Sequence, residues 1–221
     1  MLPRNLDPAE VRVLGSLIEK ELTTPDHYPL SLNSLVSACN QSSNREPVTS
    51  LASSTVSGAI DTLRRQDLVR SFQGSGERVP KYQHLLATAG EVSRAELAVL
   101  GVLMLRGPQT LAEVRARAAR MMTDDDPDVI EAALERLIAR EPEPAAVRLP
   151  RRAGQKELRY AHLLGGDVIV DVVVEERDEL SVAAPASIAA RIATLEALMQ
   201  EVQLEMSDLR AQFEGFRRQF E

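Results

Sequence analysis

The chain is poor in cysteine, in aromatic residues and in long apolar runs, and each scarcity excludes something. Its one cysteine, Cys39, cannot form a disulfide within the chain, which fits a reducing cytoplasm. Aromatic residues make up 3% of the sequence and tryptophan is absent, so any core must be aliphatic. No apolar run approaches the roughly 20 residues that a membrane helix needs, and the N-terminal residues carry no apolar signal segment. We therefore expect a cytoplasmic protein with no membrane contact.

Charge is distributed unevenly along the chain. A formal net charge of −7 over 221 residues disfavours a nucleic-acid partner at first sight. However, residues 1–90 and residues 91–165 each contain equal numbers of basic and acidic side chains, and the whole negative excess lies in residues 166–221. Two neutral segments therefore precede an acidic tail, and the acidity of the whole chain does not exclude nucleic acid.

One pattern of residues occurs twice. Val13-Leu14-Gly15-x-Leu17-Ile18 recurs as Val99-Leu100-Gly101-x-Leu103-Met104, and Tyr82-Gln83-His84-Leu85-Leu86 recurs as Tyr160-Ala161-His162-Leu163-Leu164. Between these ends, apolar positions at helical spacing also correspond: Leu32, Leu35, Val56, Ala59, Ile60 and Leu63 recur as Leu111, Val114, Ile130, Ala133, Leu134 and Leu137. The chain therefore contains a duplicated unit.

Each copy has the pattern helix, helix, helix, strand, glycine-rich loop, strand. In the first copy, apolar residues at positions 13, 14, 17 and 18 lie on one face of a helix, with Glu10, Arg12, Glu19 and Lys20 on the other. An N-cap Asp7 followed by Pro8 begins this helix. Further helices are expected at 32–38 and 53–66, and strands at 68–72 and 81–86. In the second copy, Ser93 and Glu96 form a capping box.

This order predicts a mainly α protein of the α+β class. Two tandem winged helix-turn-helix domains are expected, followed by a long C-terminal coiled-coil helix. The predicted extents are residues 1–90 and 91–165 for the two domains, 166–187 for an acidic linker or short strand, and 188–221 for the coiled-coil helix.

The last segment carries a heptad pattern. Ten apolar residues follow one another at alternating steps of four and three: Ile188, Ile192, Leu195, Met199, Val202, Met206, Leu209, Phe213, Phe216 and Phe220. The pattern predicts self-association, with a homodimer expected. The pairs Arg191–Glu196 and Glu205–Arg210 favour a parallel arrangement of the two helices. The alternative is a long helix that packs back on the two repeats. Whether the helices are parallel or antiparallel, and how many chains associate, stay open.

Basic residues concentrate in the expected wings, where they can lie along phosphates. The wing candidates for DNA contact are Arg78, Lys81, Arg148, Arg151, Arg152, Lys156 and Arg159. In helix-turn-helix proteins the last helix of the motif contacts bases, and the first copy offers Ser54, Thr55, Ser57 and Arg65 there. The alternative is a pair of solvated hairpins whose charges prevent edge pairing.

The corresponding helix of the second copy begins with Asp124-Asp125-Asp126-Pro127-Asp128, which repels phosphates. Asp124, Asp126, Asp128 and Glu135 match ligand positions of a calcium-binding EF-hand loop. However, Val129 stands where that loop requires glycine, and Ile130 belongs to the apolar face of the helix. We therefore expect base contact from the first copy rather than the second, and no metal or other cofactor.

The first copy is also longer, with extra residues within 23–29 and 40–51. Residues 40–48 form a polar loop without glycine. Its Asn and Ser side chains can cap the neighbouring helices and fix the loop. Alternatively the loop is a contact surface for a ligand, nucleic acid or protein, with Arg45 as its anchor.

No arrangement of side chains suggests catalysis. His84 and His162 occupy equivalent positions of the repeat, which favours a packing or hydrogen-bonding role. Cys39 has no histidine partner at a recognisable spacing, and neither a Ser-His-Asp set nor a phosphate-binding loop is present in the sequence. We expect a protein that is not an enzyme.

Segments at the insertions of the first copy and in the second copy carry a family resemblance. The segments Glu19-Lys20-Glu21-Leu22-Thr23-Thr24-Pro25, Tyr28-Pro29-Leu30-Ser31, Ala38-Cys39-Asn40-Gln41, Asn44-Arg45-Glu46-Pro47-Val48, Arg106-Gly107-Pro108-Gln109-Thr110 and Arg115-x-Arg117-Ala118-Ala119-Arg120-Met121 resemble the YceH-like family of uncharacterised bacterial proteins. The resemblance covers about residues 6–164. It implies a tandem winged-helix fold in a bacterial cytoplasmic protein, and it brings no catalytic residues with it.

Two hypotheses for function follow. In the first, the chain is a non-enzymatic regulator-like protein that binds double-stranded DNA and self-associates through its C-terminal helix. In the second, the winged folds are docking surfaces of a protein-protein interaction scaffold that does not bind DNA. Fold alone does not decide between them.

Overall fold

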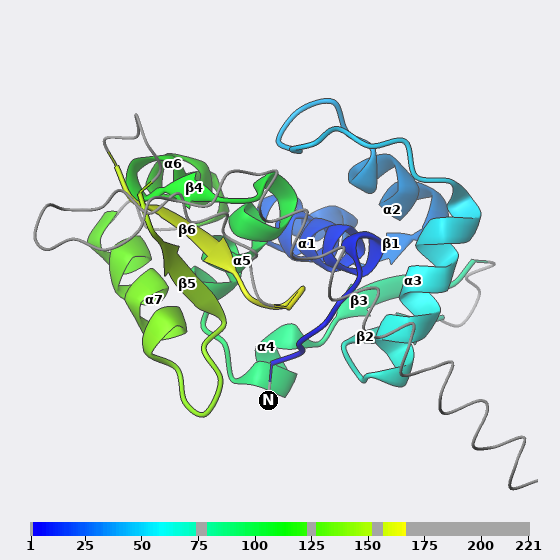
Figure 1. Cartoon of the computed structure of the whole chain (residues 1–221). Helices are drawn as coiled ribbons and strands as arrows, with labels where there is room; N and C mark the ends of the chain where they lie inside the picture. The colour runs from blue at the N-terminus through cyan, green and yellow to red at the C-terminus, as the bar shows by residue number, and fades with distance from the viewer. Residues whose placement is uncertain (1, 74–78, 123–126, 152–156, 167–221) are drawn as a thin grey trace, which may run out of the picture. The chain divides into compact units, whose positions relative to one another are not determined.

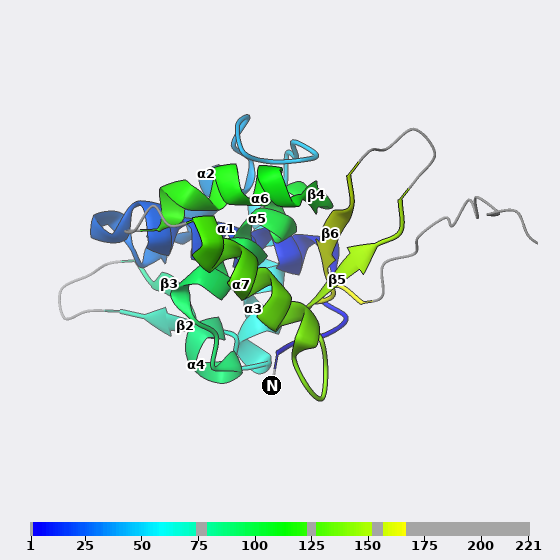
Figure 2. The same ribbon diagram turned by 90° about the vertical axis from the view of Figure 1, so that its left-hand side faces the viewer.

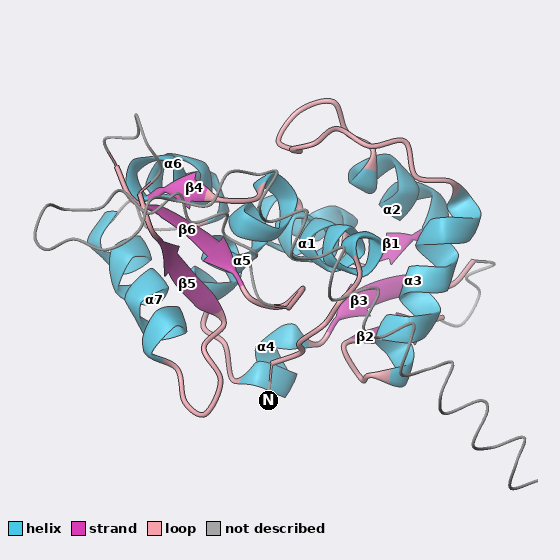
Figure 3. Ribbon diagram, viewed as in Figure 1, coloured by secondary structure: helices cyan, strands magenta, loops and turns pink. Residues whose placement is uncertain are grey.

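The computed structural model describes residues 2–73, 79–122, 127–151 and 157–166. Over these ranges the protein is a helix-rich α+β structure with two small antiparallel sheets (Figure 1 and Figure 3). None of the helices described is long and apolar enough to cross a membrane. The predicted coiled-coil helix, and the linker before it from residue 167 onward, lie outside the described residues.

The first repeat begins with the capping that the sequence predicts. The Asp7 carboxylate accepts a hydrogen bond from the Glu10 N–H, and the Glu10 carboxylate accepts one from the Asp7 N–H. The elements of this repeat are α1 (Pro8–Thr23), the 3-10 helix η1 (Pro25–His27), β1 (Leu30–Ser31), α2 (Leu32–Cys39), α3 (Ser53–Arg65), β2 (Val69–Phe72) and β3 (Lys81–His84). The strands form a sheet in the order β1-β3-β2. The two-residue strand β1 was not predicted from the sequence. The last strand was predicted to reach residue 86, whereas β3 ends at His84.

The second repeat has the same order of α-helices and strands, with its 3-10 helix at a different place. After the connecting helix α4 (Leu86–Gly90) come α5 (Arg94–Arg106), β4 (Gln109–Thr110), α6 (Leu111–Ala118), η2 (Ala119–Met121), α7 (Pro127–Ala139), β5 (Ala146–Leu149) and β6 (Arg159–His162). Its sheet has the order β4-β6-β5. Leu30 pairs with Tyr82 in the first sheet and Gln109 pairs with Tyr160 in the second, so the duplication extends to strand register.

The two repeats pack together through their first helices. In both views α1 and α5 lie side by side (Figure 1 and Figure 2). A Cβ added at Gly15 would lie 3.1 Å from Cβ of Met104, and one added at Gly101 would lie 3.1 Å from Cγ2 of Ile18. Ile18 and Met104 are counterparts in the repeat, so the contact is the same in both directions, as at a twofold interface between identical subunits. The repeated glycine therefore serves the close approach of α1 to α5.

This packing buries α1 on more than its apolar face. Glu10, Arg12 and Glu19 are only 5%, 6% and 2% exposed, although helical periodicity places them opposite the apolar residues. The apolar core extends continuously from the first repeat into the second. A helix covered on two sides needs internal partners for its charged side chains. Glu10 has its partner in the capping box with Asp7, whereas the partners of Arg12 and Glu19 come from the inserted loop and from the second repeat.

Candidate functional site

Helix α3 presents a polar face to solvent. Val56, Ile60 and Leu63 are buried on its inner side. Of the predicted DNA-contact residues, Ser54, Thr55 and Arg65 are exposed and Ser57 is half-buried. Gly58 also faces open space, because nothing lies within 4 Å of the position a Cβ would take there. The outer face of α3 is therefore polar and unobstructed within the described residues.

A groove of about 540 Å³ lies between the end of α3 and strand β2. Its described lining residues include Arg64, Arg65 and Arg70, with Asp61 as the one carboxylate among them. The Asp61 carboxylate lies 3.6 Å from Nη1 of Arg64, and Arg65 donates a 2.9 Å hydrogen bond to the hydroxyl of Thr62. The groove therefore carries an excess of positive charge. Sequence reasoning did not propose Arg70 as a contact, although its alternation with buried Val69 in a short strand is the signal that places it outward.

The β2–β3 hairpin, which is the predicted wing of the first repeat, is described only at its base. Lys81 is half-buried on β3, opposite Phe72 of β2. Phe72 and Val79 are both exposed, at 52% and 53%. Arg78 lies outside the described residues.

In the second repeat, arginines are paired with its own carboxylates. Arg148 lies 2.6 Å from Oε1 of Glu135, and its guanidinium stacks over the ring of Tyr160. The Glu135 carboxylate raises the pKa of Arg148. Arg115 contacts Glu131 in the same way, and its Nη2 also lies 3.7 Å from Asp128. These pairs reduce the positive charge that the second repeat offers to a partner.

The remaining candidates of this repeat differ in position. Arg159 Nη1 lies 3.0 Å from the carbonyl oxygen of Pro108 and 3.5 Å from Oε2 of Glu113. Arg151 is exposed, whereas Arg152 and Lys156 lie outside the described residues. Residues 123–126, which include most of the predicted acidic cluster, lie outside them as well. Among the residues that are described, no group of three or more His, Cys, Asp or Glu side chains could hold a metal ion.

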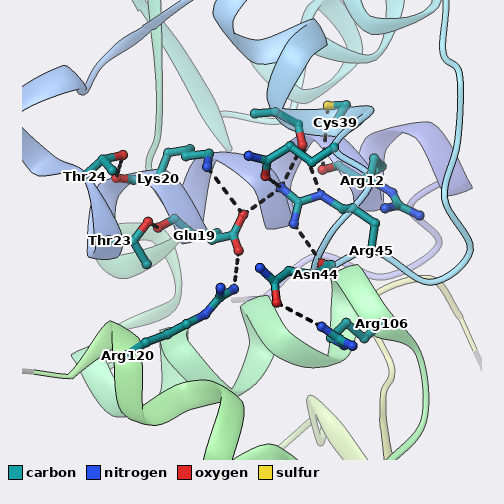
Figure 4. Close-up of polar contacts among 12 residues, drawn as sticks. Arg12, Glu19, Lys20, Thr23, Thr24, Cys39, Asn44, Arg45, Arg106 and Arg120 are labelled. Atoms are coloured by element: carbon teal, nitrogen blue, oxygen red, sulfur yellow. Dashed lines mark hydrogen bonds and ion pairs between the residues drawn. The ribbon is translucent and has the colours of Figure 1, made fainter.

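Arg45, the predicted anchor of the inserted loop, points inward. Its side chain is fully buried and donates to the Ala38 carbonyl through Nε at 3.0 Å and through Nη2 at 2.7 Å (Figure 4). Nη2 also donates to Oε2 of Glu19 at 2.6 Å and to Oε1 of Gln41 at 2.9 Å. With its guanidinium engaged inside the protein, Arg45 is not presented to an external partner. This geometry favours the structural interpretation of the loop.

The same loop ties the two repeats together. The second Glu19 oxygen contacts Arg120 of the second repeat (Figure 4). Oδ1 of Asn44 accepts a 3.0 Å hydrogen bond from Arg106, and the Glu46 N–H donates to the Leu105 carbonyl at 2.9 Å. Arg106 and Leu105 belong to α5 and contact the loop directly, whereas Arg120 of η2 contacts Glu19 of α1, which the loop residue Arg45 also engages. The insertion therefore joins the two repeats.

The buried side chains of Cys39 and His84 are packed inside the first repeat or contact other residues of it. Cys39 is buried, and burial raises the pKa of its thiol. His84 is 1% exposed and contacts the Glu21 carboxylate, and a hydrogen bond with His84 lowers the pKa of Glu21. The backbone N–H of His84 donates to the Tyr28 hydroxyl at 2.7 Å. Each of these groups is engaged in packing or in contacts within the first repeat, as the equivalence of His84 and His162 favours.

Comparison with known proteins identifies the family. Residues 6–155 match the family model described as "Protein of unknown function, DUF480", and the chain therefore belongs to this family. It is the family that the resemblance in the inserted loops indicated. The match covers the first repeat and the second repeat as far as the segment before β6.

Full-length relatives carry the name UPF0502 protein. One from Azoarcus sp. (strain BH72) is 47% identical over 217 residues, covering 98% of this chain and 95% of that protein. One from Geobacter sulfurreducens is 48% identical over 219 residues, covering 98% of each chain. One from Pectobacterium atrosepticum is 41% identical over 210 residues, covering 93% and 98%. The similarity therefore extends beyond the two repeats into the tail.

Proposed function

We propose that this chain is a non-enzymatic tandem winged-helix protein of the cytoplasm that binds double-stranded DNA through its first repeat. The order α1, β1, α2, α3, β2, β3 supports the winged-helix assignment, because it places the third helix before a strand hairpin. In such proteins the third helix enters the major groove and the wing lies along the backbone. The C-terminal heptad segment supports a homodimer, which would double the number of contacts with DNA.

The observation that carries this proposal is the groove beside α3. Three guanidinium groups, those of Arg64, Arg65 and Arg70, line it together with one carboxylate among the described residues. At the opposite end of the same helix, Ser54 and Thr55 are exposed. Arginine supplies phosphate contacts that position a protein on DNA, and short polar side chains can contact base edges. The second repeat is the less suitable one, because carboxylates of that repeat engage Arg148 and Arg115.

The experiment is a fluorescence anisotropy titration of a mixed-sequence duplex with the full chain at several salt concentrations. Arg65→Ala and Arg70→Ala should each weaken binding and reduce the slope of log K against log salt by about 1. Arg148→Ala is the matched control, because it removes an arginine that is already paired with Glu135. Binding that is independent of salt, or equally weakened by all three substitutions, would contradict the proposal.

A second candidate is a protein-interaction scaffold that does not bind DNA. The pairing of the second repeat's arginines favours it, since a neutralised surface suits a protein partner better than a polyanion. Absence of duplex binding at low salt, together with a stoichiometric protein partner in a pull-down, would decide for this function. Retention of DNA without such a partner would decide for the first.

A further inference from the structure

A pocket of about 760 Å³ opens in the first repeat beside η1. Its walls come from the end of α1, from η1 and β1, from one side of α2, and from Lys81 on β3. Small-molecule sites typically have volumes of roughly 300–1,000 Å³. The pocket has no lining residue in common with the groove beside α3, so it is a separate feature of the same repeat.

The pocket exists because the first repeat is longer at this point. Residues 24–29 separate α1 from β1, whereas Gly107 and Pro108 separate α5 from β4 in the second repeat. There, Gln109 is buried, and its amide donates to the carbonyls of Arg106 at 3.2 Å and Pro108 at 3.0 Å. In the second repeat, the buried side chain of Gln109 therefore packs against the short connection, while the longer connection of the first repeat borders the pocket.

The lining of the pocket has the composition of an anion site. Lys20 and Lys81 bring positive charge to it, and Asp26 is the one carboxylate among its described lining residues. Nζ of Lys20 lies 4.0 Å from Oε2 of Glu19, a carboxylate that Arg45 already engages at 2.6 Å. Hydroxyl groups of a threonine and of three serines on the α2 side complete the polar lining.

These groups favour phosphate over carboxylate. Lysine binds phosphate as a point charge, whereas planar carboxylates are matched by the fork of arginine, which this lining lacks. The hydroxyl groups of Thr24 and Ser37 donate to the carbonyls of Lys20 and Asn33, so their oxygens can accept hydrogen bonds from the hydroxyl groups of an organic ligand. The pocket is also larger than an inorganic phosphate ion needs.

The two repeats differ at the third residue of the helix that follows their first strand. Ser34 is the third residue of α2, and Glu113 is the third residue of α6. In the second repeat, the Glu113 carboxylate lies 3.5 Å from Nη1 of Arg159, the counterpart of Lys81. The first repeat has the Ser34 hydroxyl where the second has this internal carboxylate, so the lining at this position is uncharged.

We propose that the pocket binds a small organic phosphate. Lys20 and Lys81 contact the phosphate group, and the hydroxyl groups on the α2 side, among them that of Ser34, contact the organic part. This site does not require that the protein bind DNA.

Isothermal titration of the full chain at constant ionic strength tests the proposal. The probes are glucose 6-phosphate, inorganic phosphate, glucose and gluconate. Glucose 6-phosphate should bind more tightly than inorganic phosphate, glucose should not bind, and gluconate should bind at least about tenfold more weakly than glucose 6-phosphate. No binding of either phosphate probe at millimolar concentration, or equal binding of gluconate, overturns the assignment.

Substitution of Ser34 separates binding from folding. Ser34→Glu supplies the carboxylate of the second repeat and completes a capping box with Ser31, as Thr110 and Glu113 do. The variant should therefore lose at least about tenfold in affinity for glucose 6-phosphate while its melting temperature stays equal or rises.

Ser42→Glu adds the same charge at an exposed position outside the lining and should keep the affinity. Lys81→Gln should also weaken binding about tenfold. An equal loss in Ser42→Glu and Ser34→Glu would overturn the site.

Discussion

The carboxylate of Glu19 accepts a 2.6 Å hydrogen bond from Nη2 of Arg45, and the two side chains are only 3% and 0% exposed. Glu19 belongs to the first helix, while Arg45 belongs to the loop inserted between α2 and α3. A buried charge must be compensated by its partners. The pair therefore holds the inserted loop against α1, from where the loop reaches the second repeat.

Removal of Arg45 should destabilise the whole repeat pair. Arg45→Ala leaves the Glu19 carboxylate with less compensation and the Ala38 carbonyl without its donor, so we expect a loss of about 3 kcal/mol in the free energy of unfolding. Urea unfolding followed by circular dichroism measures it. Arg65→Ala, an exposed arginine of α3, should change stability by less than about 0.5 kcal/mol. Equal stability of the two variants would contradict the role assigned to the loop.

Substitution by alanine should lower stability at Gly15, which lies at the contact of α1 with α5, and raise it at Gly58, which lies on an open face. A methyl group at Gly15 would meet Met104 and Leu105 at 3.1 Å, so Gly15→Ala should cost about 1–3 kcal/mol. Gly58→Ala in α3 meets nothing and should stabilise by about 0.5–1 kcal/mol, because alanine is the better helix former. Thermal unfolding of both variants gives the comparison. A stabilising effect at Gly15 would show that the helices can separate without cost.

Stability should fall in mild acid because of His162. Burial lowers the pKa of His162 to about 4, below the ordinary histidine value of 6.5. Between these two values the unfolded chain takes up a proton that the native state does not, so the stabilisation is present above pH 6.5 and is lost as pH falls towards 4. The loss should amount to at most about 3 kcal/mol.

The matched variant for this effect is His162→Gln, which cannot titrate. Its free energy of unfolding, measured by urea titration at steps between pH 7.5 and pH 4, should fall less steeply with decreasing pH than that of the native chain. Parallel curves would mean that His162 is accessible to protons in the folded state.

Elements set by local interactions could be predicted from the sequence. Asp7 and Ser93 begin α1 and α5 as expected, because an N-cap depends only on residues within one turn. The repeat offset also placed Tyr82 and Tyr160 at equivalent strand positions, which the strand registers bear out. Helix starts and the strand hairpins therefore followed from spacing, whereas the short strands β1 and β4 did not.

What the sequence did not reveal depends on contacts between distant segments. Periodicity assigns a helix one buried face, so it could not show that Glu19, on the opposite face, is also buried. That side of α1 is covered by α5 and by the inserted loop, which are distant in the sequence. The inward direction of Arg45 depends on a hydrogen bond to Ala38 that no spacing rule contains. The pairing of Arg148 with Glu135 likewise required the relative placement of β5 and α7.

Self-association through the heptad segment is a prediction from the sequence, since residues 188–220 lie outside the described ranges. Sedimentation velocity of the full chain at micromolar concentration should show a homodimer. Val202→Lys places a charge at a heptad core position and removes about 1.5–3 kcal/mol of apolar burial per chain, so the dissociation constant should rise at least about tenfold. Gln200→Lys makes the same change of charge outside the heptad core and should leave the dimer intact. A native chain that sediments as a monomer would instead support the alternative in which the C-terminal helix packs back on its own repeats.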